Sequence, residues 1–169
     1  MIPLAKQRPP RGLKRLLFRL PISLYRAGLG GFLGERFLLL THIGRKSGQP
    51  RQTVVEVVHH DIATDTYFIA SGWGETSDWF RNVQKTPTVH VKVGKRYFEA
   101  MAKRLSITQA QGMLLSYARH HPWVFPRLAK LIVGRALKPT EEDCLSLAQS
   151  VPVVGLVPHC PAMKLGRSR

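Results

Sequence analysis

Residues 37–58 read FLLLTHIGRKSGQPRQTVVEVV, and this stretch decides how the rest of the chain is interpreted. The apolar runs at 37–43 and 51–60 predict two β-strands joined by a short polar turn. Gly44 and Gly48 permit a left-handed backbone or the close approach of a ligand, and three cations lie within seven residues, at Arg45, Lys46 and Arg51. The pattern predicts a strand that ends in an anion-binding turn, suited to a phosphorylated or polycarboxylated ligand.

The regions downstream of this pair predict an α+β domain. Alternating or apolar runs indicate four more strands, at 66–71, 89–93, 96–104 and 151–158. Helices are expected at 78–85, 108–121, 122–134 and 140–149. Because five strands precede the first long helix, a β-meander or small barrel fits better than βαβ units.

The chain of 169 residues suits one domain with a single sizeable core. We expect a flexible basic arm at 1–12, a domain at 13–158 and a basic tail at 159–169. Apolar residues from Leu13 to Leu24 recur at helical spacing among cations, which predicts a short amphipathic helix broken at Pro21. Such a helix either docks on its own domain or lies on an anionic membrane surface.

The charge balance is strongly positive. Lys and Arg total 26 against 10 acids, a net charge of +16, and residues 1–55 hold eleven cations with Glu35 as their sole acid. This field attracts nucleic acid, anionic lipid or a small anionic ligand, and charge alone does not choose among them. The two cysteines, with no CxxC pair, indicate neither a disulfide framework nor a zinc site, and favour a reducing cytoplasm. Neither a signal peptide nor a membrane span is expected.

Several reaction types lack their sequence signatures. The chain has no GxSxG nucleophile elbow, no GxGxxG dinucleotide fingerprint after a strand and no GxxxxGK[ST] loop. Its seven histidines are scattered, so no metal site is expected. A second glycine-rich loop, Ala70-Ser71-Gly72-Trp73-Gly74, leaves room for a planar ring against the backbone. A ligand with a flat heteroaromatic ring and an anionic tail would fit both loops. The alternative is that the loops bind no ligand and are a glycine-rich hairpin and a solvated basic turn.

The segments 38–51, 69–74, 78–83 and 86–89 resemble, in order and spacing, the deazaflavin-dependent nitroreductase family. The resemblance covers residues 36–105 well and implies a split β-barrel with flanking helices, like the FMN-binding barrel of pyridoxamine oxidases. It implies hydride transfer from reduced coenzyme F420 to a small electron acceptor: a quinone, a nitroaromatic or an enone. The anionic tail of the coenzyme is assigned to Lys46, Ser47 and Arg51, with Arg45 nearby. The ring or its ribityl chain is assigned to Thr53, Val54, Ala70, Ser71, Gly72, Trp79 and Asn82.

The resemblance makes Ser71 the candidate catalytic residue, donating to a ring oxygen. The same hydroxyl could instead bond its own backbone. Val54 and Glu56 stand where better-known members carry Pro and Tyr, and Tyr117 is the nearest phenol on the acceptor side, so the acceptor stays open. FMN is the alternative cofactor, and a lipid or nucleic-acid binding module is the alternative class, although no specific nucleic-acid signature is present. Both a monomer and a homodimer are compatible with the family.

Overall fold

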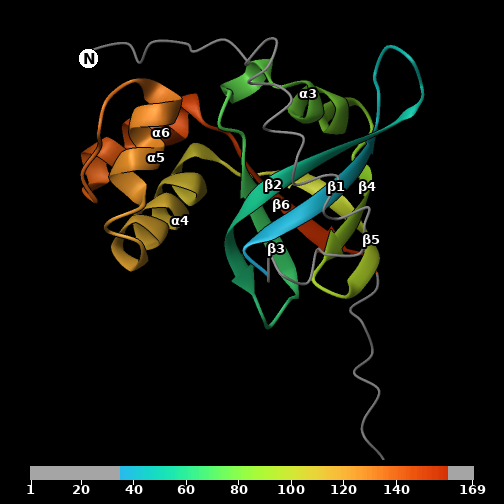
Figure 1. Cartoon of the computed structure of the whole chain (residues 1–169), viewed down its shortest axis with the longest axis horizontal. Coiled ribbons are helices and arrows are strands. Elements are labelled where there is room, and N and C mark those ends of the chain that lie inside the picture. The colour runs from blue at the N-terminus through green and yellow to red at the C-terminus, as the bar shows by residue number, and fades with distance from the viewer. Residues whose placement is uncertain (1–34, 160–169) are drawn as a thin grey trace, which may run out of the picture.

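The computed structural model describes residues 35–159, which form a closed six-stranded barrel with helices at one end and along one side (Figure 1). The strands are β1 (Phe37–Ile43), β2 (Pro50–Asp61), β3 (Thr66–Ala70), β4 (Thr88–Val93), β5 (Arg96–Arg104) and β6 (Val153–Pro158). The order around the barrel is β1-β2-β3-β6-β5-β4, every neighbouring pair is antiparallel, and β4 returns to β1. The predicted split-barrel class is confirmed.

The alternating side-chain directions of a strand place one row of residues inside the barrel, and β2 departs from this alternation between Val57 and His59. In β4, Val89, Val91 and Val93 are buried and the residues between them are half-exposed, as expected for a strand with one covered face. The β1–β2 register pairs Leu38 with Val55 and Leu40 with Thr53, which keeps these side chains in the inner row. Apolar burial in this row supplies the main stabilisation of the barrel.

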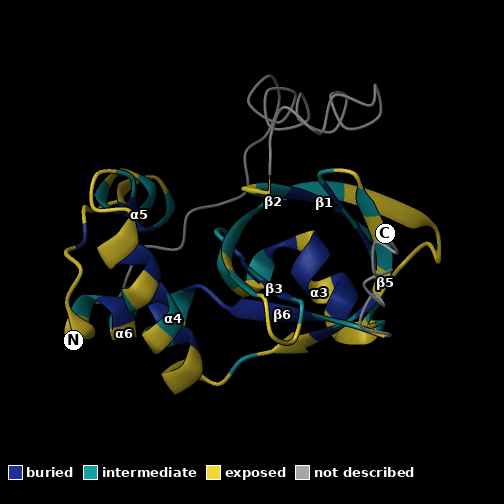
Figure 2. Ribbon diagram, turned by 90° about the horizontal axis from the view of Figure 1, so that it is seen from below, coloured by how far each residue is buried: buried dark blue, intermediate teal, exposed yellow. Residues whose placement is uncertain are grey.

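The antiparallel order gives the barrel two chemically different ends. The turn at 44–49 and the loop at 71–77 lie at one end, here called the loop end. The β2–β3 and β4–β5 turns, at 62–65 and 94–95, lie at the opposite end, here called the hairpin end. Helix α3 (Asp78–Lys85) covers the loop end (Figures 1 and 2). Its side chains that belong to the barrel core are Trp79, Phe80 and Val83.

Three further helices build a second core against the outer faces of β2, β3 and β6. They are α4 (Ile107–His120), α5 (Phe125–Val133) and α6 (Glu141–Ser150). Helix α4 begins with a capping box in which Ser106 and Gln109 satisfy each other's backbone N–H groups. Thr140 caps α6 by accepting a hydrogen bond from the Asp143 backbone N–H. Within residues 35–159, no helix is both long and apolar enough to cross a membrane.

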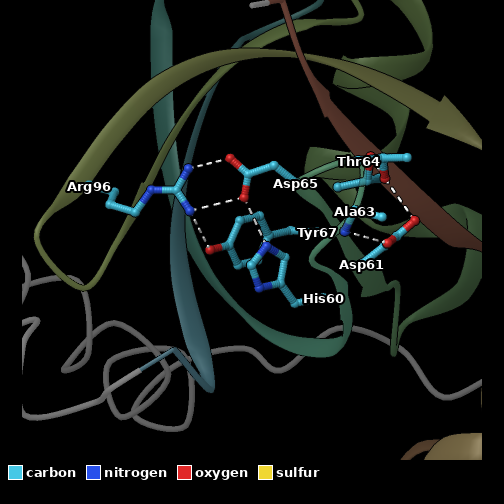
Figure 3. A network of polar contacts seen from close by, with 8 residues as sticks. His60, Asp61, Ala63, Thr64, Asp65, Tyr67 and Arg96 are labelled. Atoms are coloured by element: carbon cyan, nitrogen blue, oxygen red, sulfur yellow. Dashed lines mark hydrogen bonds and ion pairs between the residues drawn. The ribbon is translucent and has the colours of Figure 1, made fainter. Parts of the chain in front are cut away.

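A polar network closes the hairpin end (Figure 3). Arg96 donates through both Nη atoms to the Asp65 carboxylate, and Arg96 Nη1 also donates to the Tyr67 hydroxyl at 3.1 Å. The His60 ring lies 2.9 Å from Asp65 Oδ1 and stacks on the Tyr67 ring with 3.8 Å between centroids. Asp65 has a φ of +54°, which an aspartate adopts at a turn more readily than most residues do. Arg96 therefore ties two hairpins together across the opening.

The predicted elements match the observed ones closely, with one shift in the helices. Helix α5 was expected from Pro122 but starts at Phe125. Pro122 disfavours helical backbone at His121, and Val124 and Phe125 instead both donate to the His121 carbonyl in a separate turn. The expected arm at 1–12, the helix near Leu13–Leu24 and the tail at 159–169, His159 excepted, lie outside the described residues.

Candidate functional site

The basic turn between β1 and β2 is closed by its own backbone. The Gly44 N–H donates to the Gln49 carbonyl and the Gly48 N–H to the Gly44 carbonyl, both at 2.8 Å. Gly48 has a φ of +66°, which strongly favours glycine. A Cβ at Gly44 would lie only 2.8 Å from Ser47 Oγ, so a side chain would displace the serine. Both glycines are therefore needed for this compact conformation.

Helix α3 anchors the basic turn through one arginine. The Arg45 backbone N–H and its Nη1 both donate to Asn82 Oδ1 at 3.0 Å. Arg45 Nη1 also pairs with the Asp78 carboxylate at 3.0 Å, and Lys85 Nζ donates to the Arg45 carbonyl at 3.2 Å. The guanidinium of Arg45 is thus engaged with the protein itself, and its direct contact with a ligand stays a prediction.

A buried histidine lies beneath this anchor. Asn82 Nδ2 donates to His42 Nδ1 at 3.1 Å, and both side chains are nearly inaccessible to solvent. Burial lowers the pKa of His42 to about 4, because the charged ring would lose its hydration. His42 is therefore neutral near pH 7, with its proton on Nε2, and it fixes the orientation of the Asn82 amide.

Two cations of the turn remain available for a ligand. Lys46 and Arg51 are exposed, and neither side chain makes a hydrogen bond or ion pair with any residue in the described part of the chain. Ser47 Oγ accepts a weak hydrogen bond from the Gln49 N–H at 3.3 Å, so its hydroxyl proton is free to be donated. Together these three predicted residues form a cationic, donor-rich surface on a fixed backbone. That chemistry suits a phosphate or carboxylate tail.

The glycine-rich loop after β3 is organised by a buried hydroxyl. Ser71 is fully buried, its Oγ donates to the Gly74 carbonyl at 2.7 Å, and Ser77 Oγ lies 2.7 Å away on its other side. Gly74 has a φ of +61°, and a Cβ there would meet the Ser150 carbonyl at 2.8 Å. The single proton of Ser71 is already donated within the loop, so its predicted contact with a ring oxygen stays a prediction.

The other predicted ring-binding residues occupy two different surfaces. Thr53 lies in the inner row of β2 at the loop end, whereas Val54 lies in the outer row. Ala70 packs against the second core, and a Cβ at Gly72 would lie 3.4 Å from Ile132 of α5. The remaining two, Trp79 and Asn82, lie on the buried face of α3. The structure brings these residues to the loop end but gives the last two no exposed surface of their own.

The junction of the barrel and the helices contains a carboxylate–phenol pair. The Tyr117 hydroxyl donates to Glu56 Oε1 at 2.9 Å, and Arg36 Nη2 donates to the same oxygen at 3.2 Å. Burial, followed by the nearby charge of Glu56, raises the pKa of Tyr117 well above its usual value, so the phenol keeps its proton. The sequence singles out both residues separately but gives no sign that they touch.

Residues that hold the site together were the hardest to predict. The sequence did not predict that His42, Ser77 and Lys85 help to hold the candidate site together. Lys85 follows Asn82 by one helical turn, a spacing that puts the two on one face of α3 and could have indicated a shared role. Within the described residues, the structure brings no group of three or more His, Cys, Asp or Glu side chains close enough to hold a metal ion.

The fold and this site define a class: a split-barrel protein with a cationic, anion-binding turn beside a glycine-rich loop. Comparison with known families narrows the class. Residues 18–122, more than half of the chain, match the model of the F420H(2)-dependent quinone reductase family, and the chain belongs to that family. The resemblance inferred from the sequence is confirmed at the level of F420H(2)-dependent reductases.

Individual relatives are more distant. The F420H(2)-dependent quinone reductase Rv1261c of Mycobacterium tuberculosis is 32% identical over 96 residues, which span 52% of this chain and 62% of that protein. The match therefore covers less than two thirds of the relative's length. Two solved structures share the fold: protein Atu2129 of Agrobacterium tumefaciens, of unknown function (TM-score 0.53, 16% identity, 90% of this chain and 60% of that one), and HutZ, the heme storage protein of Vibrio cholerae (TM-score 0.50, 16% identity, 82% and 92%).

Proposed function

We propose that this protein is an oxidoreductase that transfers a hydride from reduced coenzyme F420 to a small organic acceptor, with a quinone as the first candidate. Family membership and the name of the related Mycobacterium tuberculosis protein support F420 as the coenzyme. The observation that carries the proposal is the pair of exposed cations, Lys46 in the turn that α3 holds in place and Arg51 at the start of β2. Nitroaromatic and enone acceptors are the other acceptor classes we propose.

The basic turn binds the anionic tail of the coenzyme. Its phosphate and carboxylates accept hydrogen bonds from Lys46, Ser47 and Arg51, whose donors face solvent on a backbone fixed by two internal hydrogen bonds. Arg45 stays bound to Asn82 and Asp78 and contributes positive charge at longer range. Preorganisation matters here because a turn that is already ordered loses little entropy when the ligand binds.

The glycine-rich loop and β2 receive the ring. Bound F420H2 supplies the hydride, from C5 of its deazaflavin. Ala70 and Gly72, with Thr53 and Val54 on β2, supply contact surface and exclude water, which favours a reaction that moves charge. Ser71 acts as a positioning residue, because its hydroxyl fixes the Gly74 carbonyl and so the path of the loop. Trp79 and Asn82 support the site from below.

Coenzyme binding tests the proposal most directly. Oxidised F420 and, separately, FMN are titrated into the full chain at two salt concentrations while tryptophan fluorescence is recorded. We expect saturable binding of F420 that weakens about tenfold in Lys46→Ala and in Arg51→Ala, because each removes one charge-assisted contact. Lys95→Ala is the matched control, since Lys95 is an equally exposed lysine at the hairpin end.

The outcomes separate the alternatives. Tight binding of FMN alone would move the protein to flavin chemistry, in which a single phosphate occupies the same cations. Binding of neither cofactor would contradict the proposal and favour a lipid or nucleic-acid binding role. Once F420 binding is established, oxidation of F420H2 by a quinone, a nitroaromatic and an enone ranks the acceptors by kcat/KM.

A further inference from the structure

An exposed tryptophan lies in the turn before α5, whose outward face carries cations. Trp123 is 82% exposed and Leu131 is 52% exposed. Arg127, Lys130 and Leu131 are exposed on one side of α5, because steps of three and four residues return to the same helix face, and Trp123 lies in the turn directly before the helix. The opposite side of α5 is buried in the second core through Phe125, Ala129 and Val133. Trp123, Arg127, Lys130 and Leu131 are called the Trp123 face.

The surroundings of the Trp123 face carry charge of one sign. Residues 100–140 contain no Asp or Glu and hold seven cations: Lys103, Arg104, Arg119, Arg127, Lys130, Arg135 and Lys138. Arg104 and Arg135 form ion pairs with Glu75 and Asp143. In contrast, the side chains of Arg119, Arg127 and Lys130 make no hydrogen bond or ion pair within residues 35–159. The positive charge beside Trp123 is therefore not neutralised by the described part of the protein.

We propose that the Trp123 face docks on the surface of an anionic lipid bilayer, with the Trp123 ring in the headgroup region. An indole ring has an apolar body and one polar N–H, and it prefers the membrane–water interface. Lys and Arg near an anionic membrane each contribute about 1 kcal/mol of attraction. An amphipathic helix with apolar residues beside cations binds by both effects together, and it lies on the surface without crossing.

The choice of a bilayer follows from the composition of the face. Nucleic acid would be attracted by Arg127 and Lys130 but would have no use for the exposed Leu131. A bilayer accommodates the cations in its headgroups and the two apolar side chains just below them. The docking does not rest on the proposed function, although it would bring α5 between the bilayer and the glycine-rich loop, since Ile132 contacts Gly72 from the inner side of the same helix.

Vesicle sedimentation with matched double variants tests the docking. The full chain is incubated with phosphatidylcholine vesicles and with vesicles that also contain phosphatidylglycerol. We expect the anionic vesicles to bind it and the double variant Trp123→Ser/Lys130→Ser to bind about tenfold more weakly. The control is Tyr97→Ser/Lys95→Ser, which also removes one exposed aromatic ring and one exposed lysine, but at the hairpin end. Its binding should match that of the wild type.

A second measurement identifies the side chain that enters the bilayer. Brominated lipids quench a tryptophan only at short range, so we expect quenching in the wild type and its loss in Trp123→Phe, which keeps an aromatic ring and therefore retains binding. Quenching that persists in Trp123→Phe would overturn the proposal, because another tryptophan would be the inserted one. Equal binding by the two double variants would overturn it too. So would binding of single-stranded RNA that Trp123→Ser/Lys130→Ser weakens while vesicle binding is unchanged.

Discussion

Asn82 Oδ1 accepts two hydrogen bonds from Arg45, one from its backbone N–H and one from its guanidinium, each at 3.0 Å. This pair connects helix α3 to the basic turn across 37 positions of sequence. With Asn82 Nδ2 directed to the buried His42, the amide has partners on both of its ends. Asn82 is therefore the buried member of the group of α3 side chains that hold the cationic turn at the loop end, together with Asp78 and Lys85.

Replacing Asn82 by alanine should weaken both stability and coenzyme binding. The change leaves the Arg45 N–H and His42 Nδ1 without their partners, so we expect the free energy of unfolding to fall by about 2 kcal/mol. We expect the F420 affinity to fall as well, because the turn loses its anchor. Urea denaturation and fluorescence titration measure the two effects. Gln84→Ala, an exposed position on the same helix, is the control and should change neither.

The buried ring of His42 should make the protein less stable in mild acid. Its pKa is about 4 when folded and close to 6.5 when unfolded, so between these values the unfolded chain binds the additional proton. Stability from this group is complete above pH 6.5 and decreases as pH falls toward 4. The expected loss is about 2 kcal/mol at pH 5.

A comparison of urea denaturation at pH 7.5 and pH 5 in the wild type and in His42→Gln measures this contribution. Glutamine keeps an acceptor for Asn82 but does not titrate, so the difference between the two pH values should shrink in the variant. An unchanged difference would show that groups other than His42 cause the acid sensitivity.

Replacing Arg96 by methionine should affect stability and leave coenzyme binding intact. Arg96 hydrogen-bonds the half-buried Asp65, and this contact is the largest cause of the lowered pKa of that carboxyl group. The Asp65–Arg96 ion pair stabilises the folded protein at pH values above the pKa that Asp65 has in the unfolded chain. This stabilisation is lost as the pH falls through the lower pKa that Asp65 has in the folded protein. At pH 7 we expect Arg96→Met to cost about 2 kcal/mol, since it leaves a carboxylate without its cation.

The additional change Asp65→Asn should recover part of that loss, because the uncompensated charge is removed. The F420 dissociation constant should match the wild type in both variants, since the network lies at the hairpin end, away from the basic turn. A large change in that constant would mean that the two ends of the barrel are coupled.

A comparison of two single variants, Ser71→Ala and Ser77→Ala, tests how Ser71 acts. It distinguishes a role in positioning the loop from direct contact between the Ser71 hydroxyl and the deazaflavin ring. Their hydroxyl groups lie 2.7 Å apart in one buried chain that ends on the Gly74 carbonyl. If the chain acts by fixing the loop, both variants should lose about 1 kcal/mol of stability and slow the single-turnover oxidation of F420H2 to similar extents. A much larger rate loss in Ser71→Ala alone would assign that hydroxyl to the ring.

Local pattern predicted the elements well, and for a physical reason. In β4, apolar and polar residues alternate because one face of the strand is buried. In β1, the continuous apolar run Leu38-Leu39-Leu40 occurs because both faces are buried. Burial of this kind can be read directly from the spacing of apolar residues in the sequence. Both glycines of the basic turn were recognised because their role is local. The capping of α6 by Thr140 also follows from neighbouring residues.

The polar contacts that hold the site were not predictable in the same way. Arg45 was assigned to the ligand from its charge, yet its guanidinium is bound to Asn82 and Asp78. Glu56 and Tyr117, or Asp65 and Arg96, meet only because the barrel brings distant strands and helices together. Pairs of residues that are distant in sequence leave no local pattern. The sequence therefore indicates which residue types are present at the site, but only the fold shows which of their side chains are available to a ligand.

The placement of β6 between β3 and β5 also has a consequence for synthesis on the ribosome. Ile69 pairs with Val154 and Ala102 with Leu156, so β3 and β5 each present an unpaired edge until residues 153–158 have emerged. Unpaired edges invite association with other chains. Until then we expect the nascent protein to be an open sheet with two unpaired edge strands, β3 and β5. We therefore expect chaperones that shield strand edges to increase its yield more than chaperones that promote helix docking.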